Sequence, residues 1–227
     1  MNEFKAHYYD QVALIAVDVQ NDFCPGGSMA VDEGDLVVPA LNRVMDAMRK
    51  PIYNTYDGRD YHTKQNLVIA SRDWHPELTN HFSETPNFTT TWPPHCIAGT
   101  EGAKFHPGLE LKKHHDMVRV VSKAMLKDQD AYSAFEGVTE IDVPIDELLL
   151  PNKRRVALLV GGLATDYCVK ATVLDARKLG IDTYVIKEAI RGVATETTQK
   201  AIEEMMNAGA EFITVEDVEA AYRKVMR

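Results

Sequence analysis

The sequence predicts a single α/β domain over residues 1–227, with a doubly wound, mostly parallel sheet of six strands and helices on both faces. Six short runs rich in Val and Ile have the length of strands, and stretches with apolar residues at helical spacing lie between them. The runs are continuous rather than alternating, which is typical of strands covered on both faces. A chain of 227 residues also fits one substantial domain. The predicted architecture is therefore a three-layer, Rossmann-like sandwich.

The elements follow one another as strand and helix, the order that produces parallel strands joined by right-handed crossovers. Helical spacing covers residues 36–50, 166–180 and 197–209, and the last two stretches end on Gly180 and Gly209, which are good helix stops. An amphipathic stretch at 215–227 predicts a closing helix. The expected strands are residues 12–19, 66–73, 117–124, 155–162, 182–189 and 211–217.

One segment breaks this alternation. Residues 76–116 hold five of the ten prolines and five of the eight histidines. Long irregular segments inside a compact domain are usually functional or disordered, and the aromatic and histidine content here favours function. We therefore expect a loop-rich metal and substrate region over about 73–116.

Charge and cysteine content exclude several classes of function. The formal net charge of -9 argues against nucleic acid and anionic membranes as partners, because both need clustered Lys and Arg. No apolar run approaches the roughly 20 residues that cross a bilayer, and the N-terminus lacks the apolar core of a secretory signal. Three widely spaced cysteines do not form a disulfide framework. We expect a cytoplasmic protein.

Four chemically useful side chains lie at or just after the ends of expected strands. They are Asp18, Asp73, Lys123 and Cys168. Ligands of open parallel sheets bind beyond the carboxyl ends of the strands, so these side chains should meet at one edge. Each has an ordinary alternative role, as a helix cap, a solvated cation or a small core residue. Together they predict a site.

Three of the four suit acyl transfer. A neighbouring cation and a helix N-terminus both lower a thiol pKa, and we expect Lys123 and the helix from 166 to do this for Cys168. Asp18 is then placed to accept the thiol proton and return it to a leaving amine. Backbone N–H groups in the turn before the helix can hold the oxyanion. This chemistry is most simply amide hydrolysis through a thioester.

A second group carries metal ligands. Asp73 and His75 are two residues apart, so on an extended segment both side chains point the same way, and His81 and His95 follow in the irregular segment. Mixed carboxylate and imidazole ligands suit Zn²⁺, Fe²⁺ or Mn²⁺. Histidines beside prolines also bond backbone carbonyls, and spacing alone leaves both readings open. We expect two other cysteines and four other histidines to be structural or at the surface: Cys24, Cys96, His62, His106, His114 and His115.

Four motifs together resemble a known family. "AVDVQNDFCPGG", "SRDWHP", "WPPHCIAGT" and "GGLATDYCVKATVLDA" are similar to the isochorismatase-like cysteine hydrolases, and the likeness runs in order from about residue 12 to about residue 217. Within that superfamily, "DWHP" with "WPPHC" resembles the nicotinamidases, because these motifs supply a metal site that sister amidases generally lack.

The resemblance implies a reaction and a set of roles. Nicotinamide and water would give nicotinate and ammonia through a cysteine thioester, a step of NAD salvage, with pyrazinamide as a further substrate. One divalent ion, Zn²⁺ foremost and Fe²⁺ or Mn²⁺ otherwise, would hold the ring nitrogen. The implied roles are Asp18 as base, Lys123 as charge stabiliser and Cys168 as nucleophile; Asp73, His75, His95 and His81 as metal ligands; Phe23, Trp92 and Tyr132 as pocket walls; and the N–H groups of Ala164 and Cys168 as oxyanion hole, beside a cis Leu163–Ala164 bond.

Two segments of the chain are longer than the family pattern, and two alternative functions stay open. The insert at 51–65 and the stretch from Lys123 to Gly137 are longer than in compact members of the family, and would shape the pocket mouth or a subunit contact, as in a homo-oligomer. Another amidase acting on a carbamoyl or ureido substrate is one alternative function. A non-catalytic small-molecule binding protein is the other.

Overall fold

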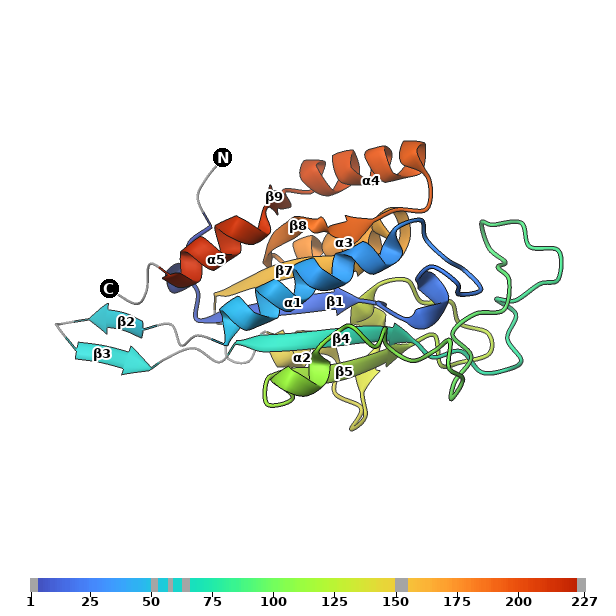
Figure 1. Ribbon diagram of the computed structural model, residues 1–227, viewed down its shortest axis with the longest axis horizontal. Coiled ribbons are helices and arrows are strands. Elements are labelled where there is room, and N and C mark those ends of the chain that lie inside the picture. Colours follow the sequence, from blue (N-terminus) through green and yellow to red (C-terminus); the bar gives the residue numbers. More distant parts are fainter. Residues whose placement is uncertain (1–3, 50–52, 57–58, 63–65, 150–154, 224–227) are drawn as a thin grey trace.

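A seven-stranded sheet forms the centre of the protein (Figure 1). The computed structural model describes residues 4–49, 53–56, 59–62, 66–149 and 155–223. The strand order is β6-β5-β4-β1-β7-β8-β9, and every pair is parallel except β5 with β6. The strands are β1 (Gln11–Val17), β4 (Leu67–Asp73), β5 (Val118–Lys123), β6 (Val138–Thr139), β7 (Val156–Leu163), β8 (Asp182–Arg191) and β9 (Glu211–Ile213).

The doubly wound α/β prediction is confirmed, with one strand more than expected. All six predicted strands are in the sheet. The seventh, β6, is a two-residue antiparallel edge strand, which is too short to leave a periodic pattern in the sequence.

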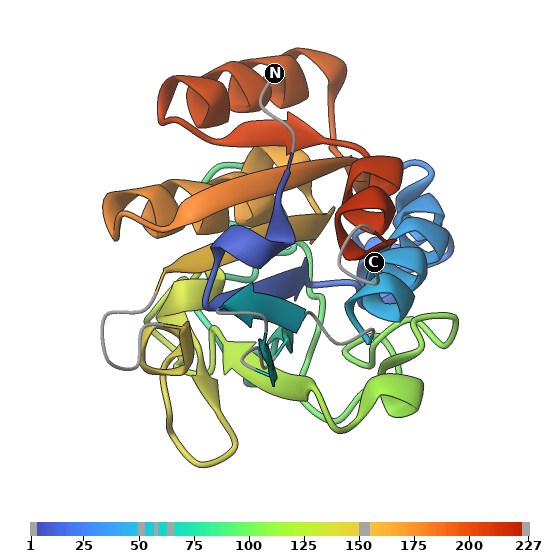
Figure 2. The same cartoon turned by 90° about the vertical axis from the view of Figure 1, so that its left-hand side faces the viewer.

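Helices cover both faces of the sheet, as Figure 2 shows. Val12, Leu14 and Ala16 of β1 pack in one apolar cluster with α1 and α5, while Ala13 and Ile15 pack in the other with α2, α3 and α4. This alternation places two separate cores on either side of one buried strand. The helices are α1 (Val37–Met48), α2 (Ile145–Leu149), α3 (Lys170–Lys178), α4 (Thr195–Asn207) and α5 (Val215–Arg223); 3₁₀ turns include Ala6–Tyr8, Asn21–Phe23, Gly34–Leu36, Leu111–His114 and Ala134–Glu136. In the part of the chain that the structure describes, no helix has the length and apolar character to cross a membrane.

The predicted strand at 211–217 is wrong over its second half. β9 ends at Ile213, and α5 begins at Val215. The N–H and hydroxyl of Thr214 both donate to the Asp217 carboxylate, and the Asp217 N–H donates back to the Thr214 hydroxyl. This reciprocal capping starts a helix where Val and Ile content alone favours a strand.

The insert between α1 and β4 contains a hairpin of β2 (Tyr53–Tyr56) and β3 (Arg59–His62), which forms its own two-stranded sheet. The rest of the insert lies outside the described residues. The hairpin projects from the end of the molecule opposite the carboxyl ends of the central strands (Figure 1). The idea that this insert shapes a pocket mouth at those carboxyl ends is therefore wrong, and its role in a subunit contact stays a prediction.

The carboxyl ends of β1, β4, β5 and β7 meet at one edge of the sheet. Asp73 pairs in register with Lys123, and Val17 pairs with Gly162. Because Asp18 directly follows β1, the parallel register brings three of the predicted side chains to the same edge. The irregular segment between β4 and β5 covers this edge (Figure 1).

Candidate active site

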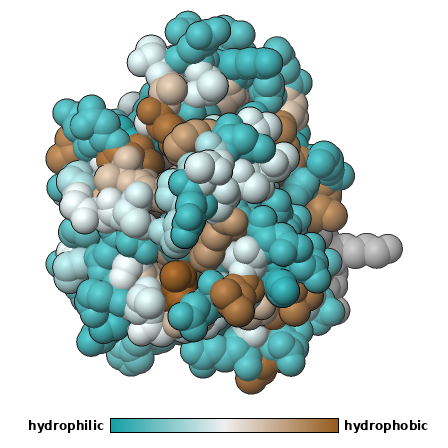
Figure 3. All heavy atoms as spheres, turned by 90° about the vertical axis from the view of Figure 1, so that its right-hand side faces the viewer, coloured by the Kyte–Doolittle hydropathy of each residue, from teal (hydrophilic) through white to brown (hydrophobic). Residues whose placement is uncertain are grey.

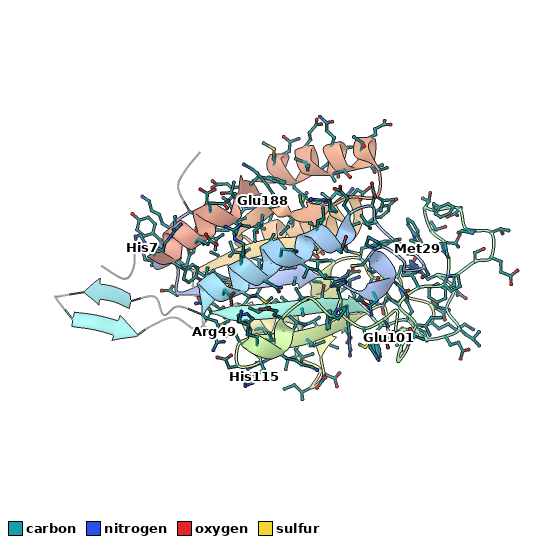
Figure 4. The ribbon with its side chains drawn as sticks, viewed as in Figure 1. His7, Met29, Arg49, Glu101, His115 and Glu188 are labelled. Atoms are coloured by element: carbon teal, nitrogen blue, oxygen red, sulfur yellow. The ribbon has the colours of Figure 1, made fainter. Side chains whose placement is uncertain are left out.

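A pocket opens at the carboxyl edge of the sheet. Figure 3 views the molecule from this side, where apolar side chains interrupt the polar surface. Met29, one of the lining residues, lies at the same end of the molecule as Glu101 of the irregular segment (Figure 4). The lining residues are Phe23, Met29, Val31, Asp73, His81, Trp92, His95, Ala131, Tyr132, Leu163, Ala164, Tyr167, Cys168 and Val193.

Lys123 stands at the centre of the buried groups. Its Nζ lies 3.0 Å from Asp18 Oδ2 and 3.5 Å from Cys168 Sγ, and it also donates to Asp73 Oδ1. Asp18, Lys123 and Cys168 are all buried. The structure thus brings together the acid, the cation and the thiol that the sequence placed at separate strand ends.

Asp18 is held in an uncommon backbone conformation. Its φ is +48°, in the left-handed region that non-glycine residues rarely adopt. The Ser71 hydroxyl of neighbouring β4 donates to Asp18 Oδ1 at 2.7 Å, and the Asp18 N–H donates to the Ser71 carbonyl at 3.1 Å. These contacts aim the second carboxylate oxygen at Lys123.

Burial and neighbouring charges shift the pKa values of Cys168, Asp18 and Lys123. Burial raises the pKa of Cys168 well above its usual range, although Lys123 opposes this, and it also raises the pKa of Asp18. Burial alone would lower the pKa of Lys123, but Asp18 and Asp73 raise it well above its ordinary value. The expectation of a depressed thiol pKa is therefore wrong, and in the resting site the thiol keeps its proton.

Cys168 lies in a π turn, Thr165–Val169, immediately before α3. The Leu163–Ala164 peptide bond is cis, as the resemblance implies, and the Ala164 carbonyl accepts from the N–H groups of Tyr167 and Val169. Ala164 and Cys168 both line the pocket, so their backbone lies beside the thiol. Their predicted role as oxyanion hole stays a prediction.

Gly162 allows this turn to approach β1. Its φ is +131°, and a Cβ at this position would lie 2.0 Å from the Val17 carbonyl oxygen. Only glycine fits such a contact. The glycine pair before the cysteine therefore brings the end of β7 against the end of β1, next to Asp18.

Three histidines gather beside the thiol. His75, His81 and His95 are buried, and one ring nitrogen of each lies within 4.8 Å of the others. Asp73 Oδ2 is 3.8 Å from His75 Nε2 and 4.0 Å from His95 Nε2. Backbone bonds assemble them, because the His75 N–H donates to the Cys96 carbonyl and the Ala98 N–H donates to the His75 carbonyl.

The donor atoms of this cluster fit a divalent metal. His95 Nδ1 is bonded to the Pro93 carbonyl at 2.8 Å, which leaves its Nε2 facing Asp73. His75 Nε2 is buried without a hydrogen-bond partner, an arrangement that proteins rarely tolerate unless something else binds there. Burial lowers the pKa of His95 to about 4, so its imidazole is neutral and able to coordinate at pH 7.

Aromatic side chains form the pocket walls. The Trp92 indole N–H donates to the Tyr132 hydroxyl at 3.1 Å, and the Phe23 ring centroid lies 5.5 Å from that of His95. Tyr167, which the sequence did not single out, meets Trp92 edge to face at 5.1 Å. The pocket is thus walled by aromatic groups, with histidines of the cluster at one side.

Gln20 is a further residue that the sequence argument missed. Its side-chain amide donates to the Asp73 carbonyl and accepts from the Asp73 N–H, both at 2.8 Å. This two-bond clamp fixes the backbone of Asp73 from the neighbouring strand end. The only sequence signal was its place in "DVQNDF", two residues after Asp18.

The other histidines and cysteines named from the sequence differ in burial. Cys24 and Cys96 are buried free thiols, and burial raises the pKa of each; their structural role stays a prediction. His115 is exposed, whereas His114 is fully buried against Asp46, so its expected surface position is wrong. The 3₁₀ turn at Leu111–His114 explains this, because it turns the last side chain inward. His106 is half-buried, and the side chain of His62 lies outside the described residues.

Comparisons with known proteins identify the family of the chain. A model of the isochorismatase domain matches residues 12–217, so the chain belongs to the isochorismatase family. Among its curated relatives is the nicotinamidase/pyrazinamidase of Mycobacterium tuberculosis, which is 40% identical over 202 residues, 88% of this chain and 97% of the relative.

Solved structures give the same result. The pyrazinamidase of Pyrococcus horikoshii in complex with zinc superposes with a TM-score of 0.71 at 36% identity, covering 89% of this chain and 98% of that one. PnC1 of L. infantum in complex with nicotinate superposes with a TM-score of 0.73 at 28% identity, covering 96% and 98%.

Proposed function

We propose that this protein is a nicotinamidase, which hydrolyses nicotinamide to nicotinate and ammonia through a thioester on Cys168. The observation that carries the proposal is the meeting of two groups in one pocket: the buried Asp18, Lys123 and Cys168, and the histidine cluster beside them. Curated relatives with nicotinamidase activity in their names support the choice of substrate.

Acylation begins with the neutral thiol. Asp18 accepts the proton of Cys168 as Sγ attacks the carboxamide carbon, which gives a tetrahedral oxyanion. The N–H groups of Ala164 and Cys168 are the donors we assign to this oxyanion. Collapse breaks the C–N bond, and the proton held by Asp18 passes to the amide nitrogen, which leaves as ammonia.

Deacylation reverses the roles. Asp18 takes a proton from water, the resulting hydroxide attacks the thioester carbon, and the thiolate leaves and recovers its proton. Lys123 stays charged throughout, because Asp18 and Asp73 raise its pKa. Its ammonium therefore stabilises the thiolate that forms and leaves in each half of the reaction, at 3.5 Å from Sγ.

The histidine cluster is assigned to substrate positioning. Asp73, His75, His81 and His95 would hold one divalent ion, which we propose to be Zn²⁺, and Fe²⁺ or Mn²⁺ suit the same ligands. Such an ion supplies an electrophile for the ring nitrogen of a pyridine. Phe23, Trp92 and Tyr132 would then bracket the ring, so that its carboxamide faces Cys168.

The substrate of this reaction belongs to NAD salvage, and pyrazinamide differs from it only in a second ring nitrogen. We propose both as substrates. The three free cysteines fit the reducing cytoplasm, where we place the enzyme.

The test is to incubate purified protein with nicotinamide, with and without a chelator, and to assay ammonia and nicotinate. Equal amounts of both products, lost after chelation and restored by Zn²⁺, support the proposal. Unimpaired turnover of a carbamoyl or ureido compound by metal-free protein, with none of nicotinamide, would identify a different amidase. Binding of small amides without turnover would identify a non-catalytic binding protein.

A further inference from the structure

One histidine of the cluster, His81, is hydrogen-bonded to a partly exposed carboxylate, that of Asp130. His81 Nδ1 lies 2.7 Å from Asp130 Oδ1, and no other carboxylate among the described residues is paired with this ring nitrogen. The His81 side chain is 7% exposed, whereas that of Asp130 is 43% exposed. The pair therefore spans from the solvent to the centre of the histidine cluster.

This bond determines which nitrogen faces the cluster. A carboxylate accepts from Nδ1–H, which leaves Nε2 as the unprotonated nitrogen with a free lone pair. His95 has the same arrangement, with the Pro93 carbonyl on its Nδ1. Two of the three clustered rings are thus fixed with Nε2 available as a ligand.

Asp130 is held in place by the longer segment between Lys123 and Tyr132. The Ala131 carbonyl accepts from Lys123 Nζ at 3.1 Å. The Lys127 carbonyl accepts from the Asn80 N–H at 3.0 Å and from the Thr79 hydroxyl at 2.9 Å. Contacts at both ends of the segment therefore fix the carboxylate that His81 meets.

We propose that Asp130 is a positioning residue for the metal site, which fixes the tautomer and orientation of His81 and makes it the fourth metal ligand. This rests on the metal-binding part of the proposed function. A contact with a partly exposed carboxylate such as Asp130 contributes little to folding, and a purely structural contact would leave metal affinity unchanged. A carboxylate behind a histidine ligand typically changes metal affinity about 10- to 100-fold.

The experiment measures Zn²⁺ affinity of the metal-free protein by competition with a chromophoric chelator. This readout needs no turnover, so a failure of the nicotinamidase assignment is detected separately by the ammonia assay. We expect Asp130→Ala to bind Zn²⁺ about 10- to 100-fold more weakly. Asp130→Asn keeps an oxygen acceptor and should recover most of the affinity.

Asp128→Ala is the matched control. It removes a carboxylate two residues away and a contact of the same segment with Asn80, but leaves the contact to His81. We expect its Zn²⁺ affinity to equal that of the wild type. Thermal unfolding of the metal-free variants should be unchanged, which separates metal positioning from loss of fold.

A double variant tests whether Asp130 acts through His81. In a His81→Ala background, Asp130→Ala should cause no further loss of Zn²⁺ affinity, because the contact is already gone. The Co²⁺-loaded forms of Asp130→Ala and His81→Ala should have the same visible spectrum, and it should differ from that of the wild type. An Asp130→Ala affinity within twofold of the wild type, or losses that add in the double variant, would overturn the proposal.

Discussion

At the scale of single residues, the ammonium group of Lys123 is surrounded by hydrogen-bond acceptors. Lys123 contacts Asp18, Asp73, the Ala131 carbonyl and the thiol of Cys168, all in a buried position. Two carboxylates so close together would repel each other without this ammonium. The cation is thus the group that allows Asp18 and Asp73 to lie side by side.

Asp18 has a role that one substitution isolates. Asp18→Asn keeps the size of the side chain but removes the proton acceptor, so we expect kcat for nicotinamide to fall about 10²- to 10⁴-fold. Bound metal should be unchanged, because the histidine cluster does not include Asp18. Steady-state kinetics with metal analysis of the same sample checks both parts, and a kcat within threefold of the wild type would rule out Asp18 as the base.

At the scale of elements, strand ends determine the site. Four parallel strands deliver the reacting groups, and glycine at the end of β7 lets the cysteine turn reach β1. The backbone is also left-handed at Asp18, Cys96 and Ala124, each at or next to a site residue. Such conformations persist only where the surrounding structure enforces them.

Gly162→Ala tests the close approach. The added Cβ meets the Val17 carbonyl, and the residue keeps a positive φ, so we expect a loss of about 3 kcal/mol or more in the free energy of unfolding. Gly180→Ala is the control, because Gly180 also has a positive φ but nothing within 4 Å of an added Cβ. It should cost about 1 kcal/mol. Equal losses in urea unfolding would mean that the contact with β1 is unimportant.

Strands of six or more Val- and Ile-rich residues could be predicted from the sequence, because burial on both faces leaves a continuous apolar run. β6 could not, since two residues carry no period, and the end of β9 was misplaced because a side-chain cap at Thr214 outweighs strand propensity. Local patterns thus specify the core elements, and capping contacts decide their ends.

Some site residues could be predicted from the sequence and others could not. Asp18, Asp73, Lys123 and Cys168 lie at or after the carboxyl ends of strands, so parallel topology predicts their meeting. Gln20, Tyr167 and Asp130 were missed because their contacts depend on how loops fold over the sheet edge. The thiol pKa was mispredicted for a related reason: the depth of burial is a property of the folded protein.

At the scale of the whole molecule, buried neutral histidines link stability to pH. Burial lowers the pKa values of His81, His95 and His114, that of His95 to about 4. Below the unfolded pKa of about 6.5, the unfolded chain binds protons that the folded protein does not. Stability is therefore present above that pH and is lost as the pH falls. Asp18 acts in the opposite direction, because its folded pKa is raised, and it opposes this loss.

We expect the metal-free protein to lose stability from about pH 6.5 towards pH 4, with about 3 kcal/mol from His95 alone. Urea unfolding of chelated protein at a series of pH values measures this. His114 is not among the residues that line the pocket, so His114→Gln should flatten part of the decline without changing metal binding. A free energy of unfolding that is constant or rises over this range would contradict the argument.

The central claim is that the thiol of Cys168, and neither of the other two buried thiols, attacks the amide carbon of the substrate. The most direct measurement is the rate of ammonia release from nicotinamide by Zn²⁺-loaded Cys168→Ala, beside Cys24→Ala and the wild type. We predict a loss of at least about 10³-fold in Cys168→Ala and a rate within a few-fold of the wild type in Cys24→Ala. Release of ammonia by Cys168→Ala at the wild-type rate would contradict the account.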